Sequence, residues 1–172
     1  MHIGQLRLHD RSRLAELLVE TGAFHADEVE VALSLFDIAH GAAGAGAEVG
    51  SGDYEFVGAF EAEQLVGYAC FGPTPATVGT YDLYWLAVDR AAQGRGIGRA
   101  LMRDVEEKLI GRGGRLLVVE TSSRPDYAST RQFYTRSGYT EAARVRDFYA
   151  PADDRIVLTT RLTTRDGGVS TR

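Results

Sequence analysis

One short segment of the chain combines glycine, arginine and glutamine at a spacing that suits phosphate binding. It consists of Gln93, Gly94, Arg95, Gly96, Ile97, Gly98 and Arg99. The apolar residues 83–88 before it predict a buried strand, and apolar residues at every fourth position from 97 to 109 predict a helix after it. Backbone N–H groups converge where a strand, a glycine-rich turn and a helix meet, and the helix dipole adds positive charge there. The segment is therefore predicted to hold a phosphorylated cofactor.

Two familiar phosphate-binding loops can be compared with this segment by their spacing. A P-loop requires Gly-Lys-Ser/Thr at its end, but Gly98 is followed by Arg99 and Ala100, so the lysine and the hydroxyl are both missing. A dinucleotide fingerprint requires a third glycine where Arg99 stands. Because Glu120 lies at about the distance of a ribose-binding acid, a nucleotide-dependent oxidoreductase is kept as an alternative.

The pattern that fits is Gln-x-x-Gly-x-Gly, formed by Gln93, Gly96 and Gly98 after a strand. A second apolar run follows at residues 115–120, and a short helix then ends in Phe-Tyr-Thr-Arg-Ser-Gly-Tyr at residues 133–139. These parts resemble the acetyl-CoA loop and the Phe-Tyr-x-x-x-Gly-Phe/Tyr signature of the GNAT superfamily of N-acyltransferases. The resemblance covers roughly residues 80–162, and it implies an enzyme that uses acetyl-CoA.

The resemblance also implies how acetyl-CoA would be held. Main-chain amides between residues 93 and 99 would bind its diphosphate, with Arg95 and Arg99 adding positive charge. The pantetheine arm would pair with the end of the preceding strand, as an added strand does. The residues of that strand end are Leu86, Ala87 and Val88, and the N–H of Leu86 would donate to the thioester carbonyl.

Two residues are candidates for catalysis. Tyr134 matches the family tyrosine that faces the cofactor sulfur, and an uncharged phenol can protonate a leaving thiolate. Asp82 is the candidate general base, because some family members carry a glutamate at this place in the central strand. Strand alternation predicts that Asp82, Tyr84 and Leu86 share one face. Two alternatives for Asp82 are a contact to the cationic amine of the substrate and a cap at the entry of the strand.

Two further residues near the expected site are open to more than one interpretation. Tyr127 stands where the family often has an asparagine that contacts the pantetheine, so that contact is not carried over. The ring of Tyr127 either stacks on the cofactor or fills space. Glu120 ends the strand at residues 115–121 and either lines the acceptor cleft or faces solvent.

Composition limits the class of protein. A chain of 172 residues fits one domain, expected over residues 1–162, with a polar tail at 163–172. No apolar run reaches the roughly twenty residues of a membrane helix, and the start does not resemble a signal peptide. The single cysteine, Cys70, is expected to be buried and fits a reducing cytoplasm. The four histidines show no metal-ligand spacing, so we expect no metal site. Because no apolar run is long enough, we also expect no membrane partner.

The charge is distributed unevenly along the chain. Residues 14–89 contain thirteen Asp and Glu and no Lys or Arg, whereas residues 90–172 contain sixteen Lys and Arg against ten acids. A basic half suits an anionic cofactor and an acidic half suits a cationic amine, although an ordinary solvated surface would give the same composition. The acidic first half disfavours nucleic acid as the main partner.

The order of the predicted elements gives an α/β fold with a mixed, strongly twisted central sheet flanked by helices, which is the order of the GNAT family. Strands are expected at residues 3–9, 54–60, 64–71, 81–88, 115–121, 139–149 and 155–162. Helices are expected at about 10–20, 27–39, 97–111 and 126–137. The Gly/Ala-rich residues 41–52 are predicted to form a mobile loop.

The function expected from these observations is N-acetylation. The acetyl group of acetyl-CoA would move to the primary amine of a small, cationic acceptor by direct attack in a ternary complex. A protein lysine or N-terminal acetyltransferase is the nearest alternative, and a non-catalytic CoA-binding regulatory module is an alternative of another class. A homodimer is compatible with the resemblance, because dimers are common among similar proteins.

Overall fold

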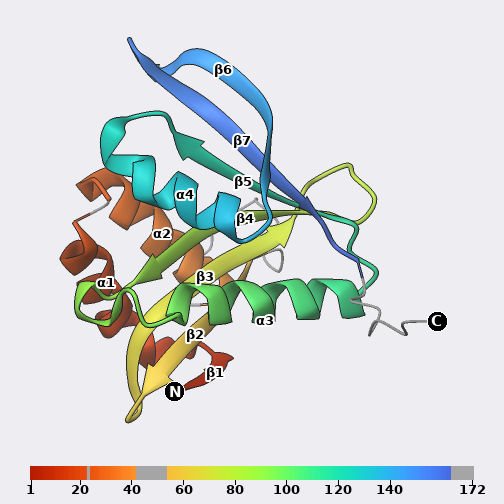
Figure 1. The fold of residues 1–172 in the computed structure, drawn as a ribbon. Coiled ribbons are helices and arrows are strands. Elements are labelled where there is room, and N and C mark those ends of the chain that lie inside the picture. The colour runs from red at the N-terminus through yellow and green to blue at the C-terminus, as the bar shows by residue number, and fades with distance from the viewer. Residues whose placement is uncertain (23, 42–53, 164–172) are drawn as a thin grey trace, which may run out of the picture.

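A mixed β-sheet runs through the centre of the protein in the computed structural model, which describes residues 1–22, 24–41 and 54–163 (Figure 1). Its strands are β1 His2–Gln5, β2 Glu55–Glu61, β3 Gln64–Pro73, β4 Thr80–Val88, β5 Leu116–Ser122, β6 Thr140–Ala150 and β7 Asp153–Arg161. Within the described residues they form one seven-stranded sheet in the order β1-β2-β3-β4-β5-β7-β6. Neighbouring strands are antiparallel except β4 and β5, which are parallel.

Helices cover both faces of this sheet. They are α1 Arg11–Thr21, α2 Ala26–Ala39, α3 Ile97–Gly111 and α4 Ala128–Arg136. Helices α1 and α2 pack on one face, where Leu14, Leu17 and Phe36 are fully buried. Helices α3 and α4 pack on the other face. The predicted α/β fold with a mixed sheet between helices is therefore confirmed.

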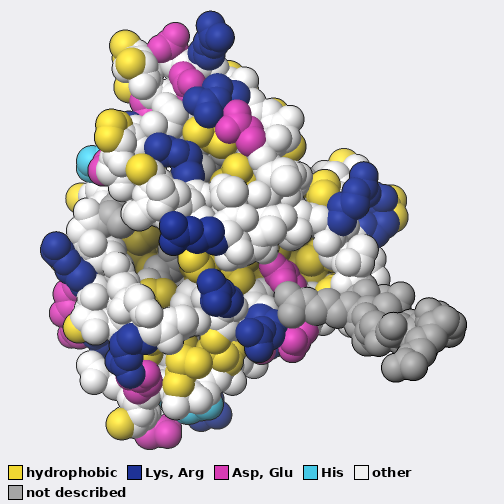
Figure 2. Space-filling model, in the orientation of Figure 1, with side chains coloured by type: hydrophobic (Ala, Val, Ile, Leu, Met, Phe, Trp, Pro, Cys, Tyr) yellow, Lys and Arg dark blue, Asp and Glu magenta, His cyan; other side chains and the backbone are white. Residues whose placement is uncertain are grey.

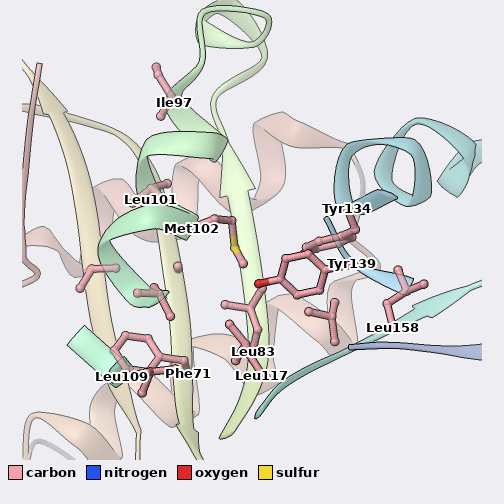
Figure 3. Close-up of a cluster of buried hydrophobic side chains, with 14 of the residues drawn as sticks. Phe71, Leu83, Ile97, Leu101, Met102, Leu109, Leu117, Tyr134, Tyr139 and Leu158 are labelled. Carbon is pink, nitrogen blue, oxygen red and sulfur yellow. The ribbon is translucent and has the colours of Figure 1, made fainter. Parts of the chain in front are cut away.

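The apolar stripe predicted from the sequence holds α3 against the sheet. Leu101, Val105 and Leu109 are fully buried, and each fully buried side chain of this kind stabilises the fold by about 1.5–3 kcal/mol. Figure 3 shows Leu101 and Leu109 beside Phe71 and the sheet, with α4 contributing from the other side of the same cluster. The start of α3, which carries the predicted phosphate-binding segment, is thereby fixed relative to β4.

The first predicted strand is shorter than expected. Strand β1 ends at Gln5, and Leu8–Asp10 forms a single 3-10 turn instead of continuing the strand to His9. The carboxylate of Asp10 accepts the backbone N–H of Arg7 at 2.8 Å, while the N–H of Asp10 donates to the carbonyl of Arg7 at 2.9 Å. This local pairing satisfies the backbone in a turn, so the chain leaves the sheet before α1.

Strand β7 begins two residues earlier than predicted, at Asp153. The carboxylate of Asp153 accepts the hydroxyl of Ser122, and the N–H of Asp154 donates to the hydroxyl of Ser123 at 2.7 Å. These bonds extend the pairing of β5 and β7 to the end of β5. The predicted loop at residues 41–52 and nearly all of the predicted tail lie outside the described residues.

Close contact between α3 and the sheet depends on Gly67 in β3. A Cβ atom at this position would lie 3.0 Å from the carbonyl oxygen of Ala87, 3.2 Å from Ile97 and 3.3 Å from Leu101. We predict that Gly67→Ala lowers the free energy of unfolding by about 1–3 kcal/mol, because a backbone oxygen cannot yield as a side chain does. Urea denaturation measures this change.

Gly111→Ala is the matched control, since nothing lies within 4 Å of a Cβ atom at this last residue of α3. Alanine favours a helix over glycine, so this variant should be neutral or more stable by up to about 1 kcal/mol. Equal destabilisation of both variants would show that close packing at Gly67 is not the cause.

Candidate functional site

The candidate site lies where the two parallel strands β4 and β5 part. They pair at only four positions in the described chain, from Thr80 with Leu116 to Leu83 with Val119. Beyond Leu83, β4 continues to Val88 and β5 continues to Ser122 without pairing to each other. A cavity of about 180 Å³ occupies this wedge. Its lining consists of Thr21, Phe24, Leu83, Tyr84, Trp85, Leu86, Ala87, Val88, Gln93, Val119, Glu120, Thr121, Tyr127, Thr130 and Tyr134.

A β-bulge in β4 determines which side chains face each side of the wedge. Trp85 is opposite Cys70 and Leu83 is opposite Phe71, so Tyr84 is an extra residue on β4. Leu83 packs with α3 and α4, as do Leu86 and Val88 farther along the strand, whereas Trp85 and Ala87 pack on the side of α1 and α2.

The predicted common face for Asp82, Tyr84 and Leu86 is wrong for this reason. Asp82 precedes the bulge and Leu86 follows it, so the extra residue reverses the alternation between them. Asp82 and Tyr84 lie toward α1 and α2, and Leu86 lies toward α3 and α4.

The predicted phosphate-binding segment forms a turn with the backbone geometry that its glycines suggest. Gly94 and Gly96 have φ angles of 75° and 83°, a left-handed conformation that favours glycine. Gly98 serves a different purpose, because a Cβ atom there would lie 3.3 Å from the ring of Phe133 on α4. Within the described residues, no hydrogen bond uses a backbone N–H of residues 93–99 as donor. These N–H groups at the start of α3 are therefore available to an anion.

The side chains of the segment differ in their surroundings. The amide of Gln93 donates to the carbonyl of Val88 at 3.1 Å and so closes the turn onto the end of β4. Arg95 pairs with Glu61 at 2.8 Å, which directs its charge toward the β2–β3 hairpin. Arg99 is exposed on the first turn of α3.

A half-buried ion pair fixes the chain between β4 and this segment. The carboxylate of Asp89 accepts the guanidinium of Arg13 at 2.6 Å and the N–H of Ala91 at 3.0 Å. Arg13 lies on α1 and also donates to the carbonyl of Leu65 at 3.2 Å. Asp89 therefore connects α1 to the turn that leads into Gln93.

Tyr134 projects from α4 into the wedge and lines the cavity. Burial raises the pKa of its phenol above the usual value, so the hydroxyl stays protonated at neutral pH. Its ring packs edge-on against Phe133 and Tyr139, which restricts its orientation. Among the described residues, its hydroxyl has no hydrogen-bond partner. The phenol is thus a positioned donor that faces the cavity.

The two candidate acids lie in different places. Asp82 is not among the residues that line the cavity, and its carboxylate accepts the hydroxyl of Thr74 at 2.7 Å. Glu120 does line the cavity, at the part of β5 that has separated from β4. It pairs with Arg155 of β7, whose guanidinium lies 4.9 Å from the centre of the Phe148 ring. The carboxylate available in the wedge is therefore that of Glu120.

Aromatic residues form the remaining wall, and most of them carried no functional signal in the sequence. Phe24 stands in the short connection between α1 and α2, and Trp85 is the only tryptophan of the chain. Tyr127 is half-buried beside the guanidinium of Arg124, and burial and the nearby Glu28 raise the pKa of its phenol. Two sequence features would have pointed to the first two residues: Phe24 is an apolar residue in a turn, and Trp85 is a tryptophan in a strand.

The other predictions concern groups outside the wedge. Cys70 is buried as expected, and burial raises the pKa of its thiol. In the part of the chain that the structure describes, no group of three or more His, Cys, Asp or Glu is arranged to hold a metal ion. None of the described helices is long and apolar enough to span a bilayer.

The sequence of the chain resembles those of known acetyltransferases. Residues 14–139 match the model of the Acetyltransferase (GNAT) family. The curated N-alpha-acetyltransferase RimI of Mycobacterium tuberculosis (strain ATCC 25618 / H37Rv) is 33% identical over 135 residues, which cover 77% of this chain and 81% of the relative.

Solved structures of acetyltransferases have the same fold as this chain. A GNAT-family protein from Desulfovibrio desulfuricans has a TM-score of 0.83 and 38% identity, covering 94% of this chain and 99% of the other. An aminoglycoside 6'-N-acetyltransferase complexed with coenzyme A shares the fold at 16% identity, with a TM-score of 0.73 and coverage of 96% and 99%.

The ion pair between Arg13 and Asp89 yields a test of how the loop is positioned. We predict that Arg13→Gln weakens acetyl-CoA binding about tenfold, equivalent to about 1.4 kcal/mol, because Asp89 loses a partner and the following turn loosens. Isothermal titration calorimetry measures the affinity, and Arg13→Lys should recover part of it.

Arg11→Gln is the control for this test. Arg11 lies on the same helix and pairs with Asp37 through two bonds of 2.6 and 2.7 Å, away from the wedge. Its loss should change the affinity less than twofold. An equal effect of both substitutions would contradict a specific role for Arg13.

Proposed function

Because the chain belongs to the GNAT acetyltransferase family, we propose that it transfers the acetyl group of acetyl-CoA to a primary amine by direct attack in a ternary complex. The observation that carries this proposal is the wedge between β4 and β5. Unpaired backbone of β4, the Tyr134 phenol and the Glu120 carboxylate all border the same cavity. These are the groups that acyl transfer to an amine needs: a place for the thioester, an acid and a base.

Binding of acetyl-CoA is proposed to use backbone groups. The N–H groups of residues 93–99 suit its diphosphate, and the positive end of the α3 dipole adds to the attraction. The free edge of β4 at Leu86, Ala87 and Val88 suits the amides of the pantetheine arm. The N–H of Leu86 is the proposed donor to the thioester carbonyl, where it would stabilise the developing oxyanion.

Two side chains are proposed to move protons. Tyr134 would donate its phenolic proton to the CoA thiolate as the C–S bond breaks, since burial keeps it protonated. Glu120 would accept a proton from the ammonium group of the acceptor, directly or through one water, and Arg155 would hold its carboxylate in place. Glu120 replaces Asp82 as our first choice of base because it lines the cavity.

The proposed acceptor is the α-amine at the N-terminus of a protein. The identity to an N-alpha-acetyltransferase over most of both chains favours it over a small amine. An apolar surface outside the cavity also suits a peptide, since Phe148 and Tyr149 stand about half exposed on β6. Phe148 lies against Arg155, the partner of Glu120. A small cationic amine is the second candidate, favoured by the carboxylates of Glu28 and Asp126 near Tyr127.

Thiol release from acetyl-CoA tests the proposed function. Peptides with a free N-terminus should release CoA at least about tenfold more efficiently than the same peptides with a blocked N-terminus and an internal lysine, or than polyamines and aminoglycosides. Higher efficiency with the small amines would favour the second candidate. Binding of acetyl-CoA without release of CoA in the presence of any amine would overturn catalysis and favour a regulatory CoA-binding module. A change in the fluorescence of a nicotinamide cofactor on mixing would favour an oxidoreductase.

Removal of the Tyr134 hydroxyl should affect the chemical step and leave binding intact. We predict that Tyr134→Phe lowers kcat by about 10²-fold, the usual contribution of a general acid, with the Kd for acetyl-CoA changed less than threefold. Because burial raises the pKa of Tyr134, its phenol should stay protonated at every pH below about 10. Wild-type kcat should therefore not fall in this range through loss of the phenolic proton. Unchanged turnover in the variant would rule out the acid role.

The choice between the two acids is tested by a pair of isosteric variants. We predict that Glu120→Gln lowers kcat/KM by about 10²-fold, because an amide cannot accept the proton of the amine. Asp82→Asn should change it less than threefold, because its carboxylate lies outside the cavity and retains an acceptor oxygen for Thr74. The reverse order of the two effects would return the base role to Asp82.

A further inference from the structure

A second hollow lies beside the proposed diphosphate site, between α3 and the C-terminal end of α4. It has a volume of about 160 Å³. The residues that line it are Arg99, Met102, Arg103, Glu106, Arg136 and Ser137. Figure 2 shows basic side chains over α3 and α4 on this face of the molecule. Three of the six lining residues are therefore arginines, and they come from two helices.

These three arginines are not neutralised by the protein. Within the described residues, no ion pair or hydrogen bond is found for the side chains of Arg99, Arg103 or Arg136. Arg112 and Arg144, elsewhere on the surface, each pair with a carboxylate. The one acid of the hollow, Glu106, accepts the hydroxyl of Tyr139 at 2.9 Å. Three like charges that converge on one hollow favour an anionic ligand there.

The position of the hollow relates it to the proposed cofactor. Arg99 belongs to the first turn of α3, whose N–H groups are proposed to bind the diphosphate. Arg103 lies one turn farther along the same helix, a rise of about 6 Å, and Arg136 faces it from α4. A second phosphate group that is separated from the diphosphate by one sugar can therefore reach this hollow.

We propose that Arg99, Arg103 and Arg136 form a site for the phosphomonoester on the 3′-oxygen of the CoA ribose, so that the enzyme selects CoA over its 3′-dephospho form. This inference rests on the proposed function, since it assumes that the diphosphate lies at the start of α3. The planar guanidinium groups suit the three oxygens of a terminal phosphate, which carries almost two negative charges at neutral pH. Dephospho-CoA retains the diphosphate and the pantetheine arm but lacks the 3′-phosphate that would bind in this hollow.

Steady-state kinetics with acetyl-CoA and acetyl-3′-dephospho-CoA test the site. The wild-type kcat/KM should favour acetyl-CoA by at least about tenfold. In the Arg103→Gln/Arg136→Gln double variant this preference should fall below threefold, through a higher KM for acetyl-CoA with kcat and the values for the dephospho donor unchanged. Arg161→Gln is the control, because Arg161 is exposed at the end of β7 and distant in sequence from the hollow. It should keep the full preference.

The outcomes separate this inference from the proposed function. Equal efficiency of the two donors in the wild type, or an unchanged preference in the double variant, would overturn the phosphate site and leave acetyl transfer intact. Calorimetry with adenosine 3′-phosphate 5′-diphosphate and ADP, which differ only in the 3′-phosphate, provides a readout that needs no turnover. Tighter binding of the 3′-phosphorylated nucleotide, lost in the double variant, would support the site, whereas equal binding of the two nucleotides would overturn it even if no amine is acetylated.

Discussion

The separation of β4 from β5 after Leu83 is the structural constraint on which the rest of the site depends. Unpaired backbone groups inside a protein are costly, so a sheet opens in its middle only where something else occupies the gap. Here the bulge at Tyr84 redirects β4, and Tyr134 enters from α4. In the proposed complex the pantetheine arm would complete the hydrogen bonding that the sheet leaves open. In this proposal, main-chain groups of β4 form the binding site for the pantetheine arm.

In the proposed complex the bulge would also separate the two reactants. Leu86 and Val88 face α3 and α4, where the cofactor is proposed to bind, while Trp85 and Ala87 face α1 and α2. The thioester would therefore approach the cavity from one face of the sheet and the amine from the other. The uneven charge along the sequence follows the same division, because the arginine-rich second half contains α3 and α4 and the acidic first half contains α1 and α2.

The sequence predicted the parts whose physics is local. The turn at residues 93–99 was accessible because left-handed glycines, a helix start and an apolar stripe all leave their mark within a few positions. The bulge could not be predicted, because it is defined by the register of β4 against β3 and no residue type indicates it. Regular alternation predicted that Asp82 shares a face with Leu86, and that single extra residue is why it does not. Phe24 was missed for a related reason, because only the tertiary fold brings the connection after α1 to the wedge.

Helix α1 links the two halves of the proposed site more closely than either sequence half suggests. Its first turns carry Arg13, which holds Asp89 and thereby the turn that leads to the cofactor loop. Its last residue, Thr21, lines the cavity, on the side proposed for the acceptor. One helix would therefore contact both proposed binding regions, and a shift of α1 on acceptor binding would change the position of Asp89. Because coupling between two ligands is reciprocal, bound acetyl-CoA would in turn fix the helix that borders the acceptor.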